Sequence, residues 1–209
     1  AIAPREVIEK LGVEGYRYYF MTDVTPGTDG AISFGRMEQV YNADLANSWG
    51  NLISRSTNMC IKYFEGATPE RDPEAAGYAE NPLAAAAEGI FERYAAKMEA
   101  FAYGDAAKEI MDLIHAANHY IEDSEPWTLA KDPAKAGELA NVIWNLLEVI
   151  RISAHLLMPL MPSTSAEALR RIGCEGEAAT DDMGASCVWG QLTAGLPVEK
   201  GEALFPRLG

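Results

Sequence analysis

Two polar side chains spaced by one helical turn are the first feature that could do chemistry. Asn51 and Arg55 stand four residues apart in a segment whose apolar residues recur with a helical period. Side chains at this spacing share one face of a helix, about 6 Å apart. An amide and a guanidinium fork placed there can hydrogen-bond to the edge of one unpaired base. Asn47 and Asn58 fall on the same face, so the sequence predicts an exposed polar row.

A tryptophan directly after a proline is the second feature. Pro126 must interrupt a helix, and Trp127 follows it. An indole displayed at such a break can stack on an unpaired base, which contributes about 1 to 3 kcal/mol per base. Plainer interpretations stay open, because a tryptophan in this setting often fills a core and a polar helix face often only meets solvent. Arg55 could also pair with Asp44 or with a carboxylate of a neighbouring helix.

Side chains that could bind a metal do not form a recognisable motif. His115 and His119 have i,i+4 spacing but lack the glutamate that follows the first histidine in zinc proteases. Cys60, Cys174 and Cys187 are odd in number and far from any C-x-x-C spacing. Phosphate-loop, dinucleotide-binding and serine-nucleophile motifs are absent as well. We therefore predict no metal site, no disulfide and no catalytic residue in this chain.

The composition is that of a globular chain with a strongly acidic balance. Of 209 residues, 48% are hydrophobic and 23% are charged, and the net charge is −14. Such acidity argues against a broad phosphate-binding surface, although a few side chains can still read bases locally. No apolar run is long enough to cross a membrane, and the N-terminus lacks the layout of a signal peptide. The sequence predicts a soluble protein of the reducing cytoplasm.

The helical period is clearest in residues 36–64, where Trp49 lies on the apolar stripe. Gly50 in the middle of this helix costs about 1 kcal/mol relative to alanine, which indicates close packing by another helix. Trp144 takes a similar apolar position in a later helix. An irregular excursion is predicted over 65–82. The helices predicted after it cover 83–102 and 105–122, which form a hairpin that pivots on Gly104, and then 134–157. A last short helix is predicted over 163–172, with Ser163 or Thr164 as its cap.

These elements predict an all-α fold, a bundle of about five helices over residues 36–172. Residues 1–35 are predicted as a small mixed α/β remnant: helix broken around Gly12 and Gly15, a turn at 27–30 and a strand-like piece at 31–34. Residues 173–209 are predicted as a tail whose apolar segment 204–208 docks back on the bundle.

Several of these segments resemble one protein family. Residues 41–55, Tyr-Asn-Ala-Asp-Leu-Ala-Asn-Ser-Trp-Gly-Asn-Leu-Ile-Ser-Arg, resemble the run that opens the anticodon-binding bundle of class I aminoacyl-tRNA synthetases. Asn51 and Arg55, followed by Pro126-Trp127, resemble the version found in methionyl-tRNA synthetases. Residues 4–12 and 17–19 are similar to the segment downstream of that family's K-M-S-K-S loop, and 204–207 to the end of its core.

The resemblance implies a function and partners. Asn51, Arg55, Trp127, Pro126 and Asn47 would contact the CAU anticodon of methionine-accepting tRNA, with Asn51 and Arg55 reading a cytosine. The other partner would be the catalytic domain of the same polypeptide, which uses ATP, and this chain would hold no cofactor and bind neither membrane nor DNA. The family's H-I-G-H and K-M-S-K-S signatures are absent here and lie upstream in the family's order. The chain is thus expected to be a fragment of a methionine–tRNA ligase that is not catalytic alone.

Other interpretations remain open at this point. The run at 42–47 is similar among synthetases for leucine, valine and cysteine, so the anticodon domain of one of these enzymes is the nearest alternative. A non-catalytic helical protein-interaction module would also give an acidic, all-α chain with a polar stripe. A metal-dependent enzyme rests on His115 and His119 alone.

Overall fold

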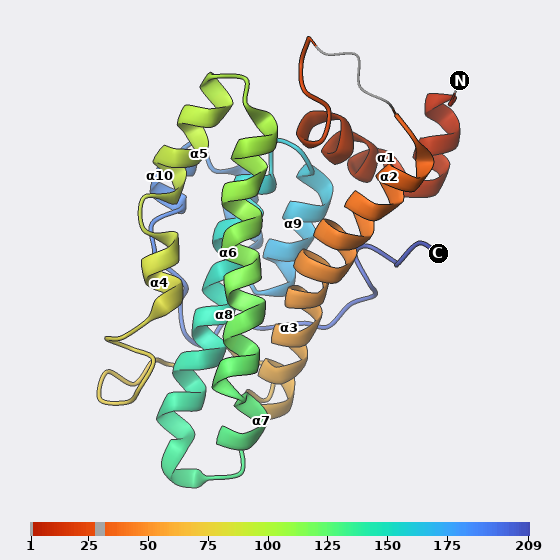
Figure 1. The fold of residues 1–209 in the computed structure, drawn as a ribbon. Helices are drawn as coiled ribbons and strands as arrows, with labels where there is room; N and C mark the ends of the chain where they lie inside the picture. Colours follow the sequence, from red (N-terminus) through yellow and green to blue (C-terminus); the bar gives the residue numbers. More distant parts are fainter. Residues whose placement is uncertain (1, 28–31) are drawn as a thin grey trace.

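A computed structural model describes residues 2–27 and 32–209 and confirms the predicted all-α class (Figure 1). Within these residues the strand-like pairing is an isolated bridge between Ala67 and Pro197. The helices are α1 (Pro4–Thr22), α2 (Phe34–Val40), the π-helix η1 (Tyr41–Gly50), α3 (Asn51–Phe64), α4 (Pro82–Ala87), α5 (Ile90–Glu99), α6 (Tyr103–Ser124), α7 (Pro126–Leu129), the 3₁₀ turn η2 (Pro133–Lys135), α8 (Ala136–Leu157), α9 (Pro162–Arg171), the 3₁₀ turn η3 (Glu175–Ala179) and α10 (Met183–Ser186).

Helix α8 is the axis of the bundle. Every residue from Leu139 to Leu157 is buried, as expected for a helix that is apolar nearly all round. It packs against α3, α6 and α9. Trp49 from η1 and Trp144 from α8 are fully buried, which confirms both as core residues. No helix in the described part of the chain is long and apolar enough to span a bilayer.

The N-terminal region is helical, and the strand predicted at 31–34 is wrong. Ser33 is the N-cap of α2, since its hydroxyl accepts a hydrogen bond from the backbone N–H of Arg36, and Phe34 is already helical. Ala31 lies outside the described residues, as do positions 28–30 of the predicted turn; Gly27 is in a turn. The predicted break at Gly12 is confirmed by its φ of 74°, whereas Gly15 continues the helix.

The helix predicted over 36–64 is confirmed as part of a continuous helical rod over residues 34–64, but the middle of this rod is a π-helix that the sequence did not reveal. Gly50 ends this wide segment. A Cβ at Gly50 would lie 2.9 Å from the carbonyl oxygen of Leu45, five residues earlier, and 3.8 Å from the Phe205 ring. The wide turn therefore requires glycine at this position, because of the Leu45 carbonyl, while Phe205 of the tail lies at ordinary contact distance. The expectation of a packed neighbouring helix is corrected.

The helical hairpin differs from its prediction in two places. Its first arm is split into α4 and α5 at Gly89, whose φ is 67°. Gly104 lies inside α6, where a Cβ would clash with the carbonyl oxygen of Thr22 in α1. The chain reverses at Phe101 (φ 58°) instead. Gly104 therefore permits close packing of α1 on α6 and is not the pivot.

The start of α9 is capped from another helix. Pro162 is its first residue, and neither Ser163 nor Thr164 acts as the N-cap, contrary to the prediction. The carboxylate of Glu14 in α1 accepts hydrogen bonds from the backbone N–H of Thr164, at 3.0 and 3.1 Å, and from its hydroxyl at 3.0 Å. A negative charge is favourable at a helix N-terminus, so Glu14 ties α1 to the bundle.

The excursion between α3 and α4 is held by two buried asparagines of α8. The Asn141 amide donates to the carbonyls of Asp72 and Ala76, both at 2.9 Å, and accepts from the Asp72 N–H at 2.9 Å. Asn145 donates to the carbonyl of Gly77 at 3.0 Å and accepts from Asn81 at 2.8 Å. This irregular segment is thereby a fixed part of the fold.

The tail docks on the bundle, as predicted. Phe205 is only 7% exposed and packs edge-on to Tyr41 and against Trp49. Asn42 exchanges two hydrogen bonds with the backbone of Leu208.

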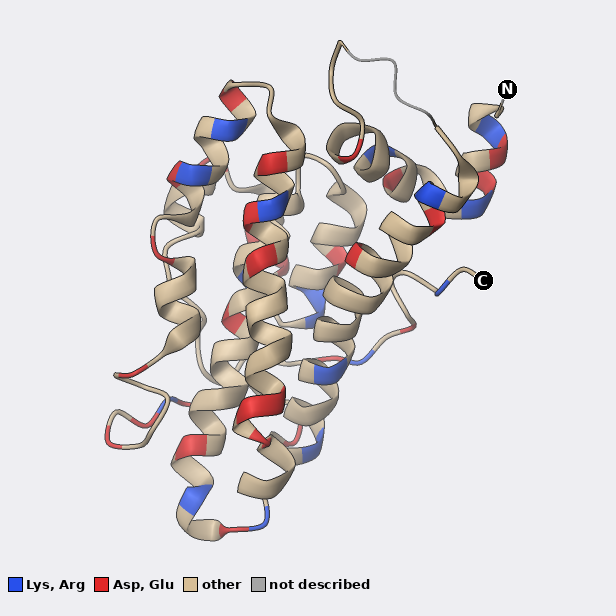
Figure 2. Cartoon of the chain, viewed as in Figure 1, with Lys and Arg blue, Asp and Glu red and all other residues tan. Residues whose placement is uncertain are grey.

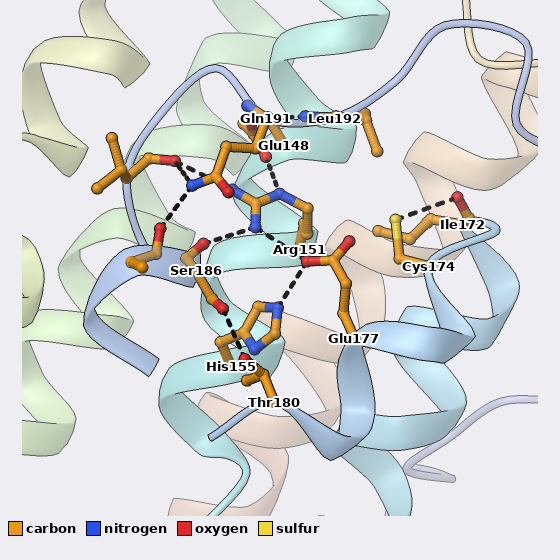
Figure 3. A network of polar contacts seen from close by, with 12 residues as sticks. Glu148, Arg151, His155, Ile172, Cys174, Glu177, Thr180, Ser186, Gln191 and Leu192 are labelled. Atoms are coloured by element: carbon orange, nitrogen blue, oxygen red, sulfur yellow. Dashed lines mark hydrogen bonds and ion pairs between the residues drawn. The ribbon is translucent and has the colours of Figure 1, made fainter. Parts of the chain in front are cut away.

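A buried carboxylate holds the middle of the tail (Figure 3). Glu148 of α8 is fully buried and accepts from the backbone N–H groups of Gly190, Gln191 and Leu192, at 2.8, 2.7 and 3.2 Å. Three amide donors on one carboxylate oxygen fix the tail against α8.

An arginine beside that carboxylate completes the network. Arg151 is fully buried, pairs with Glu148, and donates to the carbonyls of Ser186 (2.6 Å) and Val188 (3.1 Å) and to the carboxylate of Glu177 (3.2 Å). His155 also contacts Glu177, at 2.9 Å. We call Glu148, Arg151, His155 and Glu177 the α8 polar network.

Candidate nucleic-acid interface

The predicted polar row runs from η1 into α3, and most of it is exposed. Asn51 and Asn58 are exposed, Arg55 is half-buried, and Asn47 is exposed on η1. The side chains of Asn47 and Asn51 make no hydrogen bond to any described residue. Their donors and acceptors are thus available for a ligand.

The structure brings Arg55 and Trp127 together, although they are far apart in sequence. Glu125, in the left-handed region at φ 45°, ends α6, and Pro126 begins the single turn α7 beside the C-terminal half of α3 (Figure 1). Pro126 is buried and fixes the turn, whereas Trp127 is 37% exposed. A cleft of about 270 Å³ separates α3 from α7, and we call it the Trp127 cleft; it is lined by Arg55, Asn58, Met59, Lys62, Tyr63 and Trp127.

Among the described residues, Arg55 has one carboxylate partner. Its Nη2 lies 2.7 Å from Oε1 of Glu122 on α6, which confirms the alternative of a partner on the neighbouring hairpin. Asp44 instead accepts a hydrogen bond from the Tyr18 hydroxyl at 2.7 Å. An ion pair this exposed contributes about 0 to 1 kcal/mol, so a ligand can replace it at little cost. Four further guanidinium hydrogens stay available, because arginine has five N–H donors.

Asn51 faces a different cleft. This second cleft, of about 350 Å³, lies between the η1–α3 rod and the C-terminal tail, and we call it the tail cleft. It is lined by Ala46, Gly50, Asn51, Ser54, Thr57 and Arg171, and by residues 200–205 of the tail. Asn51 and Arg55 therefore share a helix face, as predicted, but border neighbouring clefts. Asn47 lines neither of the two clefts.

Sequence reasoning missed several residues of the Trp127 cleft. Met59, Lys62 and Tyr63 line it, and Asn58 was recognised only as part of the polar row. The Lys62 ammonium lies 5.5 Å from the centre of the Tyr63 ring. Continuing the i,i+3 and i,i+4 steps from Arg55 would have reached these positions. The tail residues 200–205, which line the tail cleft, could not be found by helical spacing, because they come from a distant part of the chain.

The histidines have other partners. His115 Nε2 lies 3.0 Å from the Ser48 hydroxyl, and His119 Nε2 lies 3.2 Å from Asp123. Among the residues that the structure describes, no group of three or more His, Cys, Asp or Glu side chains is placed to hold a metal ion. The interpretation based on His115 and His119 therefore has no geometric support.

The surface charge bears on how a nucleic acid could bind. Figure 2 shows acidic side chains along most helices and the Lys and Arg side chains scattered among them, without a continuous basic stripe on the face in view. Two cations, Arg55 and Lys62, line the Trp127 cleft. This arrangement suits local contacts to bases better than an extended grip on phosphates.

Comparisons with known proteins show which family and fold the chain is similar to. Residues 71–209 match the family described as the anticodon binding domain of methionyl tRNA ligase, and residues 1–57 match the class I tRNA synthetases of the methionine type. The chain is 36% identical to the methionine–tRNA ligase of Bacillus subtilis, covering 99% of this chain and 31% of that protein. It is 34% identical to the corresponding ligase of Caldanaerobacter subterraneus, covering 99% and 32%. The chain thus spans about a third of the length of these relatives.

Solved structures show the same fold. The apo form of Mycobacterium tuberculosis methionyl-tRNA synthetase superposes with a TM-score of 0.88 at 30% identity, over 100% of this chain and 41% of that one. The same enzyme in complex with methionyl-adenylate gives a TM-score of 0.87 at 31% identity, over 99% and 40%. Neither the leucine, valine and cysteine alternatives nor an unrelated interaction module is favoured by these matches.

Proposed function

Because this chain belongs to the methionine–tRNA ligase family, we propose that it reads the CAU anticodon of methionine-accepting tRNA through the exposed face of α3 and the indole of Trp127. It would do so as part of a ligase that charges this tRNA with methionine at the expense of ATP. The ATP chemistry would belong to the catalytic domain of the same polypeptide, and no cofactor is proposed for this chain. The setting would be the cytoplasm, with RNA and not DNA or a membrane as the partner.

One observation carries this proposal: Arg55 and Trp127 line the same cleft. The indole is partly exposed and held by the buried Pro126, so it offers a fixed face for a base that has left the stack. Arg55 and Asn58 offer hydrogen-bond donors, and Asn58 also an acceptor, at the edge of a base stacked there. Stacking would hold the base and hydrogen bonds would select it.

The acidic surface defines what this module contributes. With a net charge of −14, attraction for the phosphate backbone is weak. The α3 face would therefore discriminate among tRNAs more than it attracts them, and other parts of the ligase would help deliver the anticodon. The affinity of this chain for an isolated stem-loop is expected to be modest.

A stem-loop titration tests the proposal. We expect an anticodon stem-loop carrying CAU to bind better than one with the first base changed. Arg55→Ala should remove most of that preference because it removes donors at the edge of the base. Trp127→Ala should also remove most of it, because the base is then no longer held beside those donors by stacking worth about 1 to 3 kcal/mol. Arg5→Ala is the matched control for Arg55→Ala, because it removes one positive charge from the exposed first turn of α1 and Arg5 lines neither cleft. Equal binding of the two stem-loops by the unmutated chain would refute the proposed function.

A further inference from the structure

The tail cleft has two walls of different chemistry. Asn51 and Ser54 from α3 form one wall, and neither side chain has a hydrogen-bond partner among the described residues. Lys200 and Glu202 from the tail line the other wall. Amide and hydroxyl groups thus face a cation across a space of about 350 Å³.

Lys200 is a free cation at this site. It is exposed and forms no ion pair or hydrogen bond with any residue that the structure describes. Its neighbours differ in this respect: Glu199 pairs with Arg170 at 2.5 Å, and Arg170 and Arg171 both pair with Glu167. Of the two cations that line the tail cleft, Arg171 is already engaged, so Lys200 is the one that a ligand can bind without breaking an existing pair.

The tail wall is held rigidly enough to present that cation. Arg171 is 8% exposed and donates from Nη2 to the carbonyl oxygen of Glu202 at 2.8 Å. Its guanidinium lies against Gly201, where a Cβ would overlap it. The next anchor is the buried Phe205 ring. Lys200 therefore stands beside a segment fixed at both Gly201 and Phe205.

From this geometry we propose that Lys200 binds the phosphate of the nucleotide whose base faces Asn51, so that the C-terminal tail is the second wall of the reading site. This inference rests on the proposed function. An unpaired nucleotide offers both a hydrogen-bonding edge, which Asn51 and Ser54 match, and an anionic phosphate, which Lys200 matches. Lys200 is a positioning residue: it holds the nucleotide in register, and Asn51 contacts the base.

Glu202 provides a second test of the inference, because it lines the same cleft as Lys200 and carries the opposite charge. If a phosphate enters beside Lys200, the Glu202 carboxylate repels it. Lys200→Gln should then weaken binding of the CAU stem-loop about three- to tenfold, and Glu202→Gln should tighten it. Lys200→Arg, which keeps the charge, should retain most of the affinity. One lost phosphate contact should also lower the slope of log affinity against log salt by about 0.7 to 0.9.

Two comparisons separate a specific contact from a general effect of charge. Lys108→Gln removes the same charge from an exposed lysine of α6 outside the tail cleft, and it should change binding less than twofold. Stem-loops with single phosphates replaced by neutral methylphosphonates supply the second comparison. One replacement should weaken binding to the unmutated chain and have no further effect on Lys200→Gln.

Each outcome decides the inference. The phosphate contact is wrong if Lys200→Gln and Lys108→Gln weaken binding equally. It is also wrong if every methylphosphonate has the same effect on the unmutated chain and on Lys200→Gln. In both cases the proposed function stands as long as the preference for CAU persists. If the unmutated chain shows no preference for CAU, the proposed function and this inference fail together.

Discussion

Two polar regions of this molecule use the same residue types in opposite ways. Arg151 in the α8 polar network is fully buried and donates to Glu148, Glu177 and two backbone carbonyls, whereas Arg55 on α3 has one exposed carboxylate partner among the described residues. Asn145 is fully buried with donor and acceptor both used, whereas Asn51 is exposed with neither used. Polar groups that are hydrogen-bonded inside the protein hold the fold, and those without a partner on a cleft can bind a ligand.

The largest expected difference between the two regions is in stability. Arg151→Ala leaves the Glu148 carboxylate buried without its counter-charge, which should lower the free energy of unfolding by about 3 to 5 kcal/mol. Arg55→Ala breaks only an exposed ion pair and should cost less than about 1 kcal/mol. Urea unfolding of both variants measures the difference. Similar losses for the two would show that the buried network holds the fold no more strongly than a surface pair.

A smaller effect is expected for the asparagines. Asn145→Ala removes the partner of the Gly77 carbonyl and of the Asn81 amide, and should cost about 1 to 3 kcal/mol of unfolding free energy. Asn47→Ala, which breaks no hydrogen bond, should stay within about 0.5 kcal/mol. Hydrogen exchange should also show residues 70–81 opening in Asn145→Ala. Unchanged protection there would contradict the role of Asn145 as an anchor of the excursion.

The smallest effect is a dependence on pH in the α8 polar network. The hydrogen bond from His155, supported by Cys174 and Arg151 and opposed by burial, lowers the pKa of Glu177 to about 2 from an ordinary value of 4.5. Because the folded pKa is depressed, its stabilisation is present above pH 4.5 and is lost as the pH falls from 4.5 towards 2. Glu167, lowered to about 2 chiefly by Arg170, titrates in the same window. The pH profile of Glu177→Gln should therefore fall less steeply than that of the unmutated chain, and parallel profiles would rule out the Glu177 contribution.

Much of the fold was predictable because it follows from periodicity and from proline. The apolar stripe identified Trp49 and Trp144 as core residues, and Pro126 marked the break that displays Trp127. The apolar end of the tail indicated its docking through Phe205. Each of these features depends on local pattern, which a single sequence contains.

The features that were missed depend on contacts between distant segments. Glu14 caps α9 from α1, Asn141 and Asn145 hold the excursion, and Glu148 binds tail amides. Local sequence patterns do not predict such contacts between distant segments. The π-helix of η1 was missed for a related reason, since its apolar residues still fit a helical stripe and only the backbone reveals the wider turn.

The candidate site was predictable as a row of residues but not as a surface. The spacing of Asn51 and Arg55 indicated their common face, and the resemblance implied the role proposed for them. The division into the Trp127 cleft and the tail cleft appears only when α7 and the tail are placed beside α3.

The preference of Asn51→Ala for CAU over stem-loops with one anticodon base changed at a time tests the central claim most directly, because Asn51 borders the tail cleft and not the Trp127 cleft. If unsaturated groups on α3 select the base, this variant should lose most of the preference while its free energy of unfolding stays within about 0.5 kcal/mol of the unmutated chain. A preference that survives intact in a normally folded Asn51→Ala would contradict the claim.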